Sequence, residues 1–175
     1  MKTHARVWTV AVGCAVLVLS CHYEFPVVEP GAAAAVNPAL AGRWIDRAKP
    51  DDGKSPQELV ILPSRQGGAV IELRLEDGAC WLFRGQALGD ELPGWFQLEF
   101  LGDSRGNRPD DKVFTIASVK VTGGSLEWRL IDPAKAGKTD DGGQLLARLR
   151  AAAAQSEDVF GDTRTFGKAP PEPEP

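Results

Sequence analysis

The sequence is poor in the side chains that carry most enzyme chemistry. It contains two histidines, three cysteines and one tyrosine in 175 residues. His4 lies in the basic N-terminal segment and His22 directly follows Cys21, so no histidine remains in residues 37–168. A Ser-His-Asp or Cys-His catalytic group and a histidine-based zinc site are therefore excluded from that part of the chain.

Carboxylates are present, but their surroundings do not fit catalysis. A catalytic acid needs one carboxyl group removed from water so that its pKa rises, and neighbouring solvated aspartates do not provide this. The run Asp103 to Asn107 has oxygen side chains at alternate positions, but Arg105 replaces an expected calcium ligand. We therefore expect no catalytic residue, no metal site and no cofactor. The adjacent aspartates all fall in predicted loops: Asp51-Asp52, Asp110-Asp111 and Asp140-Asp141.

Clusters of basic residues are also lacking. The chain carries 20 Lys and Arg against 24 Asp and Glu. Without Lys2 and Arg6, which belong to the N-terminal segment, 18 basic residues remain and the net charge falls to −6. Binding to nucleic acid depends on Lys- and Arg-rich surfaces that neutralise phosphates. We therefore expect no nucleic-acid partner.

No apolar run is long enough to span a bilayer comfortably as a helix. The run Val7 to Leu19 is shorter than the roughly 20 residues that such a helix needs. It follows the short basic segment Met1 to Arg6. A basic start and a short apolar core are typical of a cleaved secretory signal, and we expect residues 1–20 to form one.

The boundary after this apolar run carries a more specific motif. Val18-Leu19-Ser20-Cys21 resembles the lipobox of bacterial lipoproteins, in which an aliphatic residue and a small residue precede a cysteine. The resemblance implies that Cys21 receives a diacylglyceryl group, that the signal is cut before it, and that the new amino terminus is acylated, for example with palmitate. The run Ala11 to Cys14 is a rival motif, but it would leave an apolar core of only a few residues.

The lipid implied by this resemblance makes a membrane the expected partner of the mature protein. Two or three acyl chains anchor a protein stably, whereas one chain alone binds only marginally. His22 follows the cysteine, in place of the aspartate that retains many enterobacterial lipoproteins in the inner membrane. The resemblance therefore favours the outer membrane, with the protein facing the periplasm.

The cysteine count excludes a disulfide within the mature domain. Cys14 leaves with the signal and Cys21 is expected to be acylated, so only Cys80 remains. Cys80 lies in an apolar and aromatic run, where we expect a buried and inert thiol. The fold must therefore rely on its hydrophobic core.

Prolines mark both ends of the mature chain. Residues 21–36 contain Pro26, Pro30 and a short alanine run, and they predict a lipidated cysteine followed by a flexible tether. Residues 169–175 alternate Pro with Glu and predict a disordered, extended tail. One folded domain is therefore expected over residues 37–168.

Within this domain the dominant hydrophobic period is two. Ile71 and Leu73, for example, share one face of an extended run, and Glu72 lies on the other face. Such alternation predicts half-buried antiparallel strands, and glycine-containing stretches between them predict tight turns. The predicted elements are strands over 58–62, 69–75, 80–88, 96–100, 112–122 and 126–130, a helix over 143–155, and a last short strand within 159–166.

This order of elements predicts a mainly β fold, an antiparallel meander forming a barrel with one C-terminal helix. Leu40-Ala41-Gly42-Arg43-Trp44 resembles the Leu-x-Gly-x-Trp opening of lipocalin-like domains, although the second lipocalin signature, a Thr-Asp-Tyr loop, is missing. The resemblance implies a lipocalin-like β-barrel in which Trp44 plugs one end. It also implies a basic residue packed over Trp44, for which Arg129 is the candidate. The alternative is another β-sandwich with Trp44 as a core residue.

The residues predicted to point into the barrel are bulky. Eight strands enclose a space that side chains can just fill, or that can hold one small ligand. We therefore predict a non-catalytic, membrane-anchored envelope lipoprotein whose barrel is a protein-interaction or structural module. The alternative function is a carrier or binder of a lipid or small apolar ligand in the barrel. The bulky inward sets are Phe96, Leu98 and Phe100, and Leu126, Trp128 and Leu130.

Overall fold

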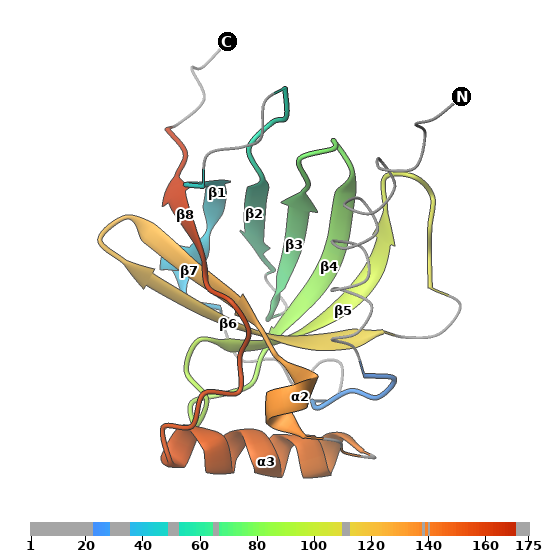
Figure 1. Ribbon diagram of the computed structural model, residues 1–175, viewed down its shortest axis with the longest axis vertical. Coiled ribbons are helices and arrows are strands. Elements are labelled where there is room, and N and C mark those ends of the chain that lie inside the picture. Colours follow the sequence, from blue (N-terminus) through green and yellow to red (C-terminus); the bar gives the residue numbers. More distant parts are fainter. Residues whose placement is uncertain are drawn as a thin grey trace, which may run out of the picture.

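The chain forms a closed antiparallel barrel of eight strands, seen in the computed structural model (Figure 1). The structure describes residues 23–28, 36–48, 53–64, 67–109, 113–137, 139 and 141–170. Each strand pairs with its neighbour in sequence, and the last strand pairs with the first. The predicted fold class, a mainly β lipocalin-like barrel with one C-terminal helix, is confirmed. The strands are β1 (Gly42–Asp46), β2 (Glu58–Pro63), β3 (Ala69–Arg74), β4 (Cys80–Ala87), β5 (Trp95–Asp103), β6 (Phe114–Thr122), β7 (Ser125–Leu130) and β8 (Arg164–Lys168).

Tight turns join β3 to β4 and β6 to β7, as the sequence predicts. Between β6 and β7, Gly123 and Gly124 have φ values of +56° and +79°, which suit a two-residue hairpin turn and would strain other residues. Between β3 and β4, Gly78 has a φ of +80° and the Leu75 N–H donates to the Ala79 carbonyl over 2.8 Å. These turns set the register in which apolar side chains alternate along each strand.

Side chains from all eight strands meet inside the barrel in one hydrophobic core. Of the predicted inward residues, Phe96, Leu98, Leu126 and Trp128 are buried, and Phe100 and Leu130 pack against them while partly exposed. Packing is close, since a Cβ added at Gly85 would lie 2.8 Å from a methyl of Ile71. The buried members are Val36, Leu40, Trp44, Leu59, Ile61, Ala69, Ile71, Phe83, Phe96, Leu98, Ala117, Val119, Leu126, Trp128 and Phe166.

A short 3-10 helix, η1 (Pro38–Leu40), covers this core where β1 begins. The Asn37 side chain accepts a hydrogen bond from the Ala39 N–H and so starts the turn. The Trp44 indole N–H donates to the Leu40 carbonyl over 2.9 Å, and the Trp44 side chain is fully buried. A buried tryptophan keeps its large apolar surface out of water only if its N–H finds an acceptor, and η1 supplies that acceptor.

Two helices follow β7, and the longer one lies against the outside of the barrel. The short helix α2 (Pro133–Ala136) starts at Asp132, whose side chain accepts from the Ala134 N–H. The long helix α3 (Gly142–Ala154) matches the predicted helix within one residue at each end, whereas α2 was not predicted. Residues 159 and 160 form no strand, because Phe160 makes only a single bridge to Ile131. No helix in the described parts of the chain is long and apolar enough to cross a membrane.

The buried face of α3 belongs to a second hydrophobic core, outside the barrel. Leu145, Leu149 and Ala152 recur at helical spacing on one face of α3 and are fully buried. They pack against outward-pointing side chains of the barrel wall, among them Ile116 of β6. The buried members are Leu88, Leu92, Ile116, Ile131, Ala136, Leu145, Leu149, Ala152, Val159 and Phe160.

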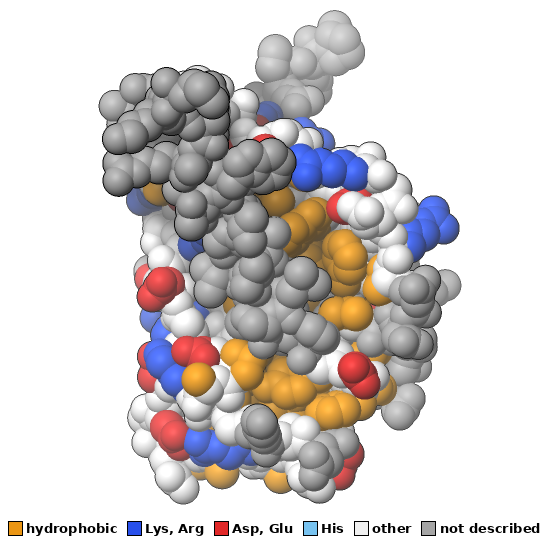
Figure 2. All heavy atoms as spheres, turned by 45° about the vertical axis from the view of Figure 1, so that its right-hand side comes forward, with side chains coloured by type: hydrophobic (Ala, Val, Ile, Leu, Met, Phe, Trp, Pro, Cys, Tyr) orange, Lys and Arg blue, Asp and Glu red, His pale blue; other side chains and the backbone are white. Residues whose placement is uncertain are grey.

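The N-terminal segment Tyr23–Val28, named here the strap, also packs on this outer core. Tyr23 and Phe114 exchange two backbone hydrogen bonds of 2.7 and 2.8 Å, and the apolar strap side chains contact the second core. On the side of the molecule brought forward in Figure 2, hydrophobic side chains gather over a broad area. The interpretation of residues 21–36 as a flexible tether is therefore wrong for the strap, whose backbone groups have partners on the barrel. Residues 21, 22 and 29–35 lie outside the described residues.

Candidate interaction groove

The C-terminal end of α3 directs the chain back across the barrel wall. The Ser156 N–H donates to the Ala153 carbonyl over 3.2 Å, and the Glu157 N–H donates to the Ala152 carbonyl over 2.8 Å. This pattern ends a helix with one residue in the left-handed region, and Ser156 has a φ of +54°. Glycine usually occupies such a position because it has no Cβ. The sharp turn at Ser156 brings Phe160 onto the outer face of β5.

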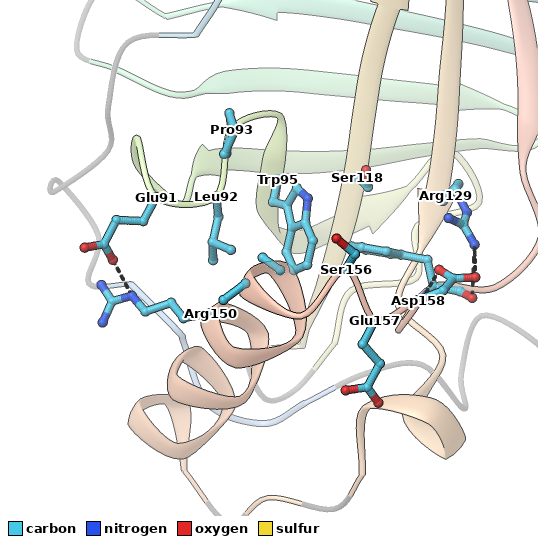
Figure 3. Close-up of a pocket in the computed structure, with 13 residues that line it drawn as sticks. Glu91, Leu92, Pro93, Trp95, Ser118, Arg129, Arg150, Ser156, Glu157 and Asp158 are labelled. Carbon is cyan, nitrogen blue, oxygen red and sulfur yellow. Dashed lines mark hydrogen bonds and ion pairs between the residues drawn. The ribbon is translucent and has the colours of Figure 1, made fainter.

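An open groove of about 830 Å³ lies between this end of α3 and the barrel. Its wall includes Trp95 and Phe160, and residues of both charge signs line its edges (Figure 3). The Trp95 and Phe160 rings meet edge to face, with their centres 4.7 Å apart. Phe160 is buried, whereas Trp95 is only partly buried and leaves apolar surface within the groove. The groove therefore combines an aromatic surface with a charged rim.

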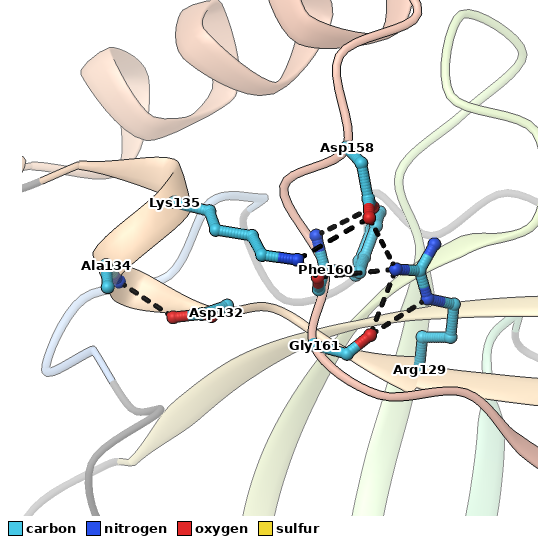
Figure 4. A network of polar contacts seen from close by, with 7 residues as sticks. All are labelled: Arg129, Asp132, Ala134, Lys135, Asp158, Phe160 and Gly161. Carbon is cyan, nitrogen blue, oxygen red and sulfur yellow. Dashed lines mark hydrogen bonds and ion pairs between the residues drawn. The ribbon is translucent and has the colours of Figure 1, made fainter.

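Arg129 holds one side of the groove through a network of polar contacts (Figure 4). Its guanidinium donates to the Asp158 carboxylate over 2.8 Å and to the Gly161 carbonyl over 3.0 Å. It also lies 5.6 Å from the centre of the Phe160 ring. The Lys135 ammonium adds a contact of 3.5 Å to Asp158 and donates to the Phe160 carbonyl. These contacts fix the segment that carries Phe160.

The same network sets the ionisation of Asp158. The hydrogen bond from Arg129 is the main cause that lowers the pKa of Asp158 from 3.8 to about 2, and the charges of Arg129 and Lys135 act in the same direction. On the neighbouring turn, the hydrogen bond from Arg148 lowers the pKa of Glu157. Arg150 forms an ion pair of 2.6 Å with Glu91 at the other rim. The rim carboxylates therefore face cationic partners.

The structure places Trp44 in the barrel core but puts a different cation over it. The Lys168 ammonium lies 5.3 Å from the centre of the Trp44 ring, and Lys168 pairs with Trp44 across β8 and β1. Arg129 is therefore not the basic residue that packs on Trp44. It follows Trp128, which points into the barrel, so strand alternation turns Arg129 outward to the groove. Lys168 shares the face of Phe166 and points inward.

A second candidate site lies inside the barrel near the β3–β4 hairpin. Leu73, Trp81 and Phe100 belong to the interior core but remain partly exposed. The Trp81 and Phe100 rings are 6.2 Å apart, and the Phe83 and Phe100 rings are 5.5 Å apart. These partly exposed side chains leave apolar surface at this end of the barrel core.

The remaining sequence candidates do not converge on a site. Cys21 lies outside the described residues, and Cys80 is only half-buried, where burial followed by a hydrogen bond with Glu72 raises its pKa. The Asp103 carboxylate accepts hydrogen bonds from the N–H groups of Arg105 and Asn107 within its own loop. Among the residues that the structure describes, no group of three His, Cys, Asp or Glu side chains could hold a metal ion.

Comparisons with models of protein families, with curated proteins and with solved structures find no match to this chain.

The groove could not be predicted from the sequence, because its residues come from the β4–β5 loop, β5, β6, β7, α3 and the turn after α3. The outward position of Trp95, beside inward Phe96, was the one local signal for it.

We predict that the Arg129→Met substitution raises the pKa of Asp158 towards 3.8, because the hydrogen bond and the charge that lower it are removed. A carboxyl group with a lowered folded-state pKa stabilises the fold above its unfolded pKa. That contribution is lost as the pH falls from about 4 to about 2. NMR titration of the Asp158 carboxyl carbon measures the change. Arg150→Met, at the other rim, is the control and leaves this titration unchanged; an equal shift in both variants would contradict the assignment.

Proposed function

We propose that this chain is a membrane-anchored lipoprotein of the bacterial cell envelope whose barrel is a non-catalytic protein-interaction module. In this proposal Cys21 carries the lipid, and the protein faces the periplasm from the outer membrane. The observation that carries the proposal is a contrast between the inside and the outside of the barrel. The interior is occupied by bulky side chains of the protein itself, whereas the groove on the outside is open.

The composition of the groove supports a protein as its ligand. The centres of protein interfaces are enriched in aromatic residues and arginine, with polar residues around them. The groove presents the partly buried Trp95 beside Phe160, and the Arg150–Glu91 pair lies at its rim. A partner segment would place an apolar side chain against Trp95 and its polar groups near this rim.

The state of the rim carboxylates supports a role without catalysis. A general acid at neutral pH needs a raised pKa, as a carboxyl group acquires in an apolar site. Asp158 and Glu157 have lowered pKa values because arginine side chains donate to them. Both therefore stay ionised at neutral pH. Residues 37–168 also contain no histidine that could act as a base.

A carrier of a lipid or small apolar ligand is the second candidate function. The partly exposed cluster of Leu73, Trp81 and Phe100 favours it, because aromatic side chains at the mouth of a barrel suit an apolar guest. The close contact between Gly85 and Ile71 deeper in the barrel disfavours it.

We expect the Cys21→Ala substitution to abolish metabolic labelling with palmitate and to release the protein from the membrane fraction, because the thiol that receives the lipid is gone. Cys14→Ala is the matched control and retains both labelling and membrane association. Labelling is read from the immunoprecipitated protein after growth with radioactive palmitate. Labelled Cys21→Ala protein would reject the lipidation site and direct attention to Cys14.

The interaction proposal is tested by cross-linking in living cells. A photoreactive phenylalanine derivative at Ala154, an exposed residue of the groove wall, should yield a discrete adduct of higher mass. The same derivative at Thr122, exposed at the end of β6 and outside the groove lining, is the control and should yield none. Adding Trp95→Ala should weaken the Ala154 adduct, since the partner loses its aromatic contact. Equal adducts from both positions, or none from Ala154, would count against the groove.

Native mass spectrometry separates the two candidate functions. The protein is exported on a cleavable secretory signal without the lipobox cysteine and purified without detergent. We expect the bare monomer mass, unchanged by added fatty acid, because the interior is filled by side chains. A bound mass that dissociates on activation and is identified as a lipid would make the protein a carrier. Trp81→Ala would then enlarge the site and serve to locate the ligand.

A further inference from the structure

The Gln97 side chain holds the C-terminal part of the strap on the barrel. Gln97 points outward from β5 yet is fully buried. Its carbonyl oxygen accepts from the N–H groups of Val27 and Val28, and its amide nitrogen donates to the Val28 carbonyl over 3.1 Å. The amide nitrogen also donates to the side-chain oxygen Oε1 of Gln86 over 2.8 Å. The Gln97 amide therefore uses its two donors and its acceptor oxygen, chiefly on the strap.

The strap also fits closely against the beginning of α3. A Cβ added at Gly142 would lie 1.9 Å from the Pro26 carbonyl oxygen, far inside contact distance. Gly142 is the first residue of α3, where alanine would otherwise favour the helix. The absence of a side chain at Gly142 thus provides the space through which the strap passes. The strap, the wall of β5 and β6, and the start of α3 form one packed unit.

The position of the strap limits how far the barrel can lie from the membrane, because the strap begins close to Cys21. Only His22 separates Tyr23 from Cys21, and two residues of extended chain span at most about 7 Å. Tyr23 itself is fixed by its two hydrogen bonds to Phe114. We propose that the strap docks the barrel directly on the lipid surface, with the start of β6 and the N-terminal end of α3 towards the bilayer. This proposal rests on the proposed lipidation of Cys21.

The proposed orientation also determines where the groove lies relative to the lipid. The strap meets the N-terminal end of α3, whereas the groove lies at its C-terminal end. A helix of 13 residues is about 20 Å long at a rise of roughly 1.5 Å per residue. The docked strap therefore holds the groove at a fixed place, at most about one helix length further from the lipid than the start of α3, whereas a flexible tether would leave its position undefined.

The test measures energy transfer from a dye on the barrel to an acceptor lipid in the membrane. The full lipidated protein carries Cys80→Ser and one new cysteine, either Ala147→Cys on the exposed side of α3 or Thr122→Cys at the far end of β6. Thr122 lies about 26 Å along β6 from Phe114, at roughly 3.3 Å per residue. The dye at Ala147 should transfer more efficiently than the dye at Thr122.

Undocking the strap should abolish this difference. Gly142→Ala sets a methyl group against the Pro26 carbonyl, and Gly143→Ala is the matched control because its Cβ contacts only the Asp141 side chain. Gln97→Ala removes the hydrogen bonds that hold Val27 and Val28 of the strap without changing α3, so it covers the case in which Gly142→Ala fails to fold. The transfer difference should vanish in Gly142→Ala and Gln97→Ala and persist in Gly143→Ala.

A longer linker between the lipidated cysteine and the strap tests whether the short distance between them holds the barrel at the membrane. Six Gly and Ser residues inserted between His22 and Tyr23 leave the strap docked but add roughly 13 Å of mean reach. Transfer from both dyes should then fall and become similar. Equal transfer from both positions in the protein without the insertion, with palmitate labelling intact, would overturn the orientation and leave the proposed function standing. Loss of palmitate labelling in that protein would overturn both.

Discussion

Strand β6 is apolar on both faces, and this constraint decides what lies outside the barrel. Ala117 and Val119 point into the barrel core, whereas Phe114 and Ile116 point outward and are 1% and 0% exposed. Leaving two large outward side chains in water would cost about 1.5–3 kcal/mol each, so this face needs a cover. The strap pairs with Phe114, and α3 packs in the same core as Ile116. The packing of the strap and of α3 on the barrel wall therefore follows from the composition of one strand.

The strap and α3 leave one end of this outer wall uncovered, and the groove lies there. The Schellman-like turn at Ser156 ends α3 before it reaches the edge of the wall, and Trp95 stays partly exposed. Phe160, held by Arg129 and Lys135, fills only part of that space. The ion pairs around the groove are half exposed, where such pairs add little stability. They set which charged groups lie along the rim of the groove.

Local sequence patterns predicted β2 to β7 and the tight turns, because alternation, β-favouring residues and turn glycines are local signals. The first strand was implied only by the resemblance at Leu40 to Trp44, and the order of the elements predicted the barrel. Features that depend on distant contacts were missed or misplaced. Pro26 within the strap and Pro30 after it favoured a tether, although Tyr23, Phe25 and Val27 alternate like a strand and were a usable signal. Arg129 was chosen by type, whereas the register of β8 against β1 puts Lys168 over Trp44. The groove joins segments far apart in the chain, and no local pattern marks it.

The barrel interior holds a hydrophobic core, whereas the groove lies on the outer wall. In this chain the outer wall is divided along α3. At its first residue, the absence of a Cβ on Gly142 admits the strap. At its last turn, Ala153 and Ala154 are too small to close the gap to Trp95. Small residues therefore lie at both ends of one helix, Gly142 beside the strap and the two alanines beside the groove, while the leucines between them pack against the same wall.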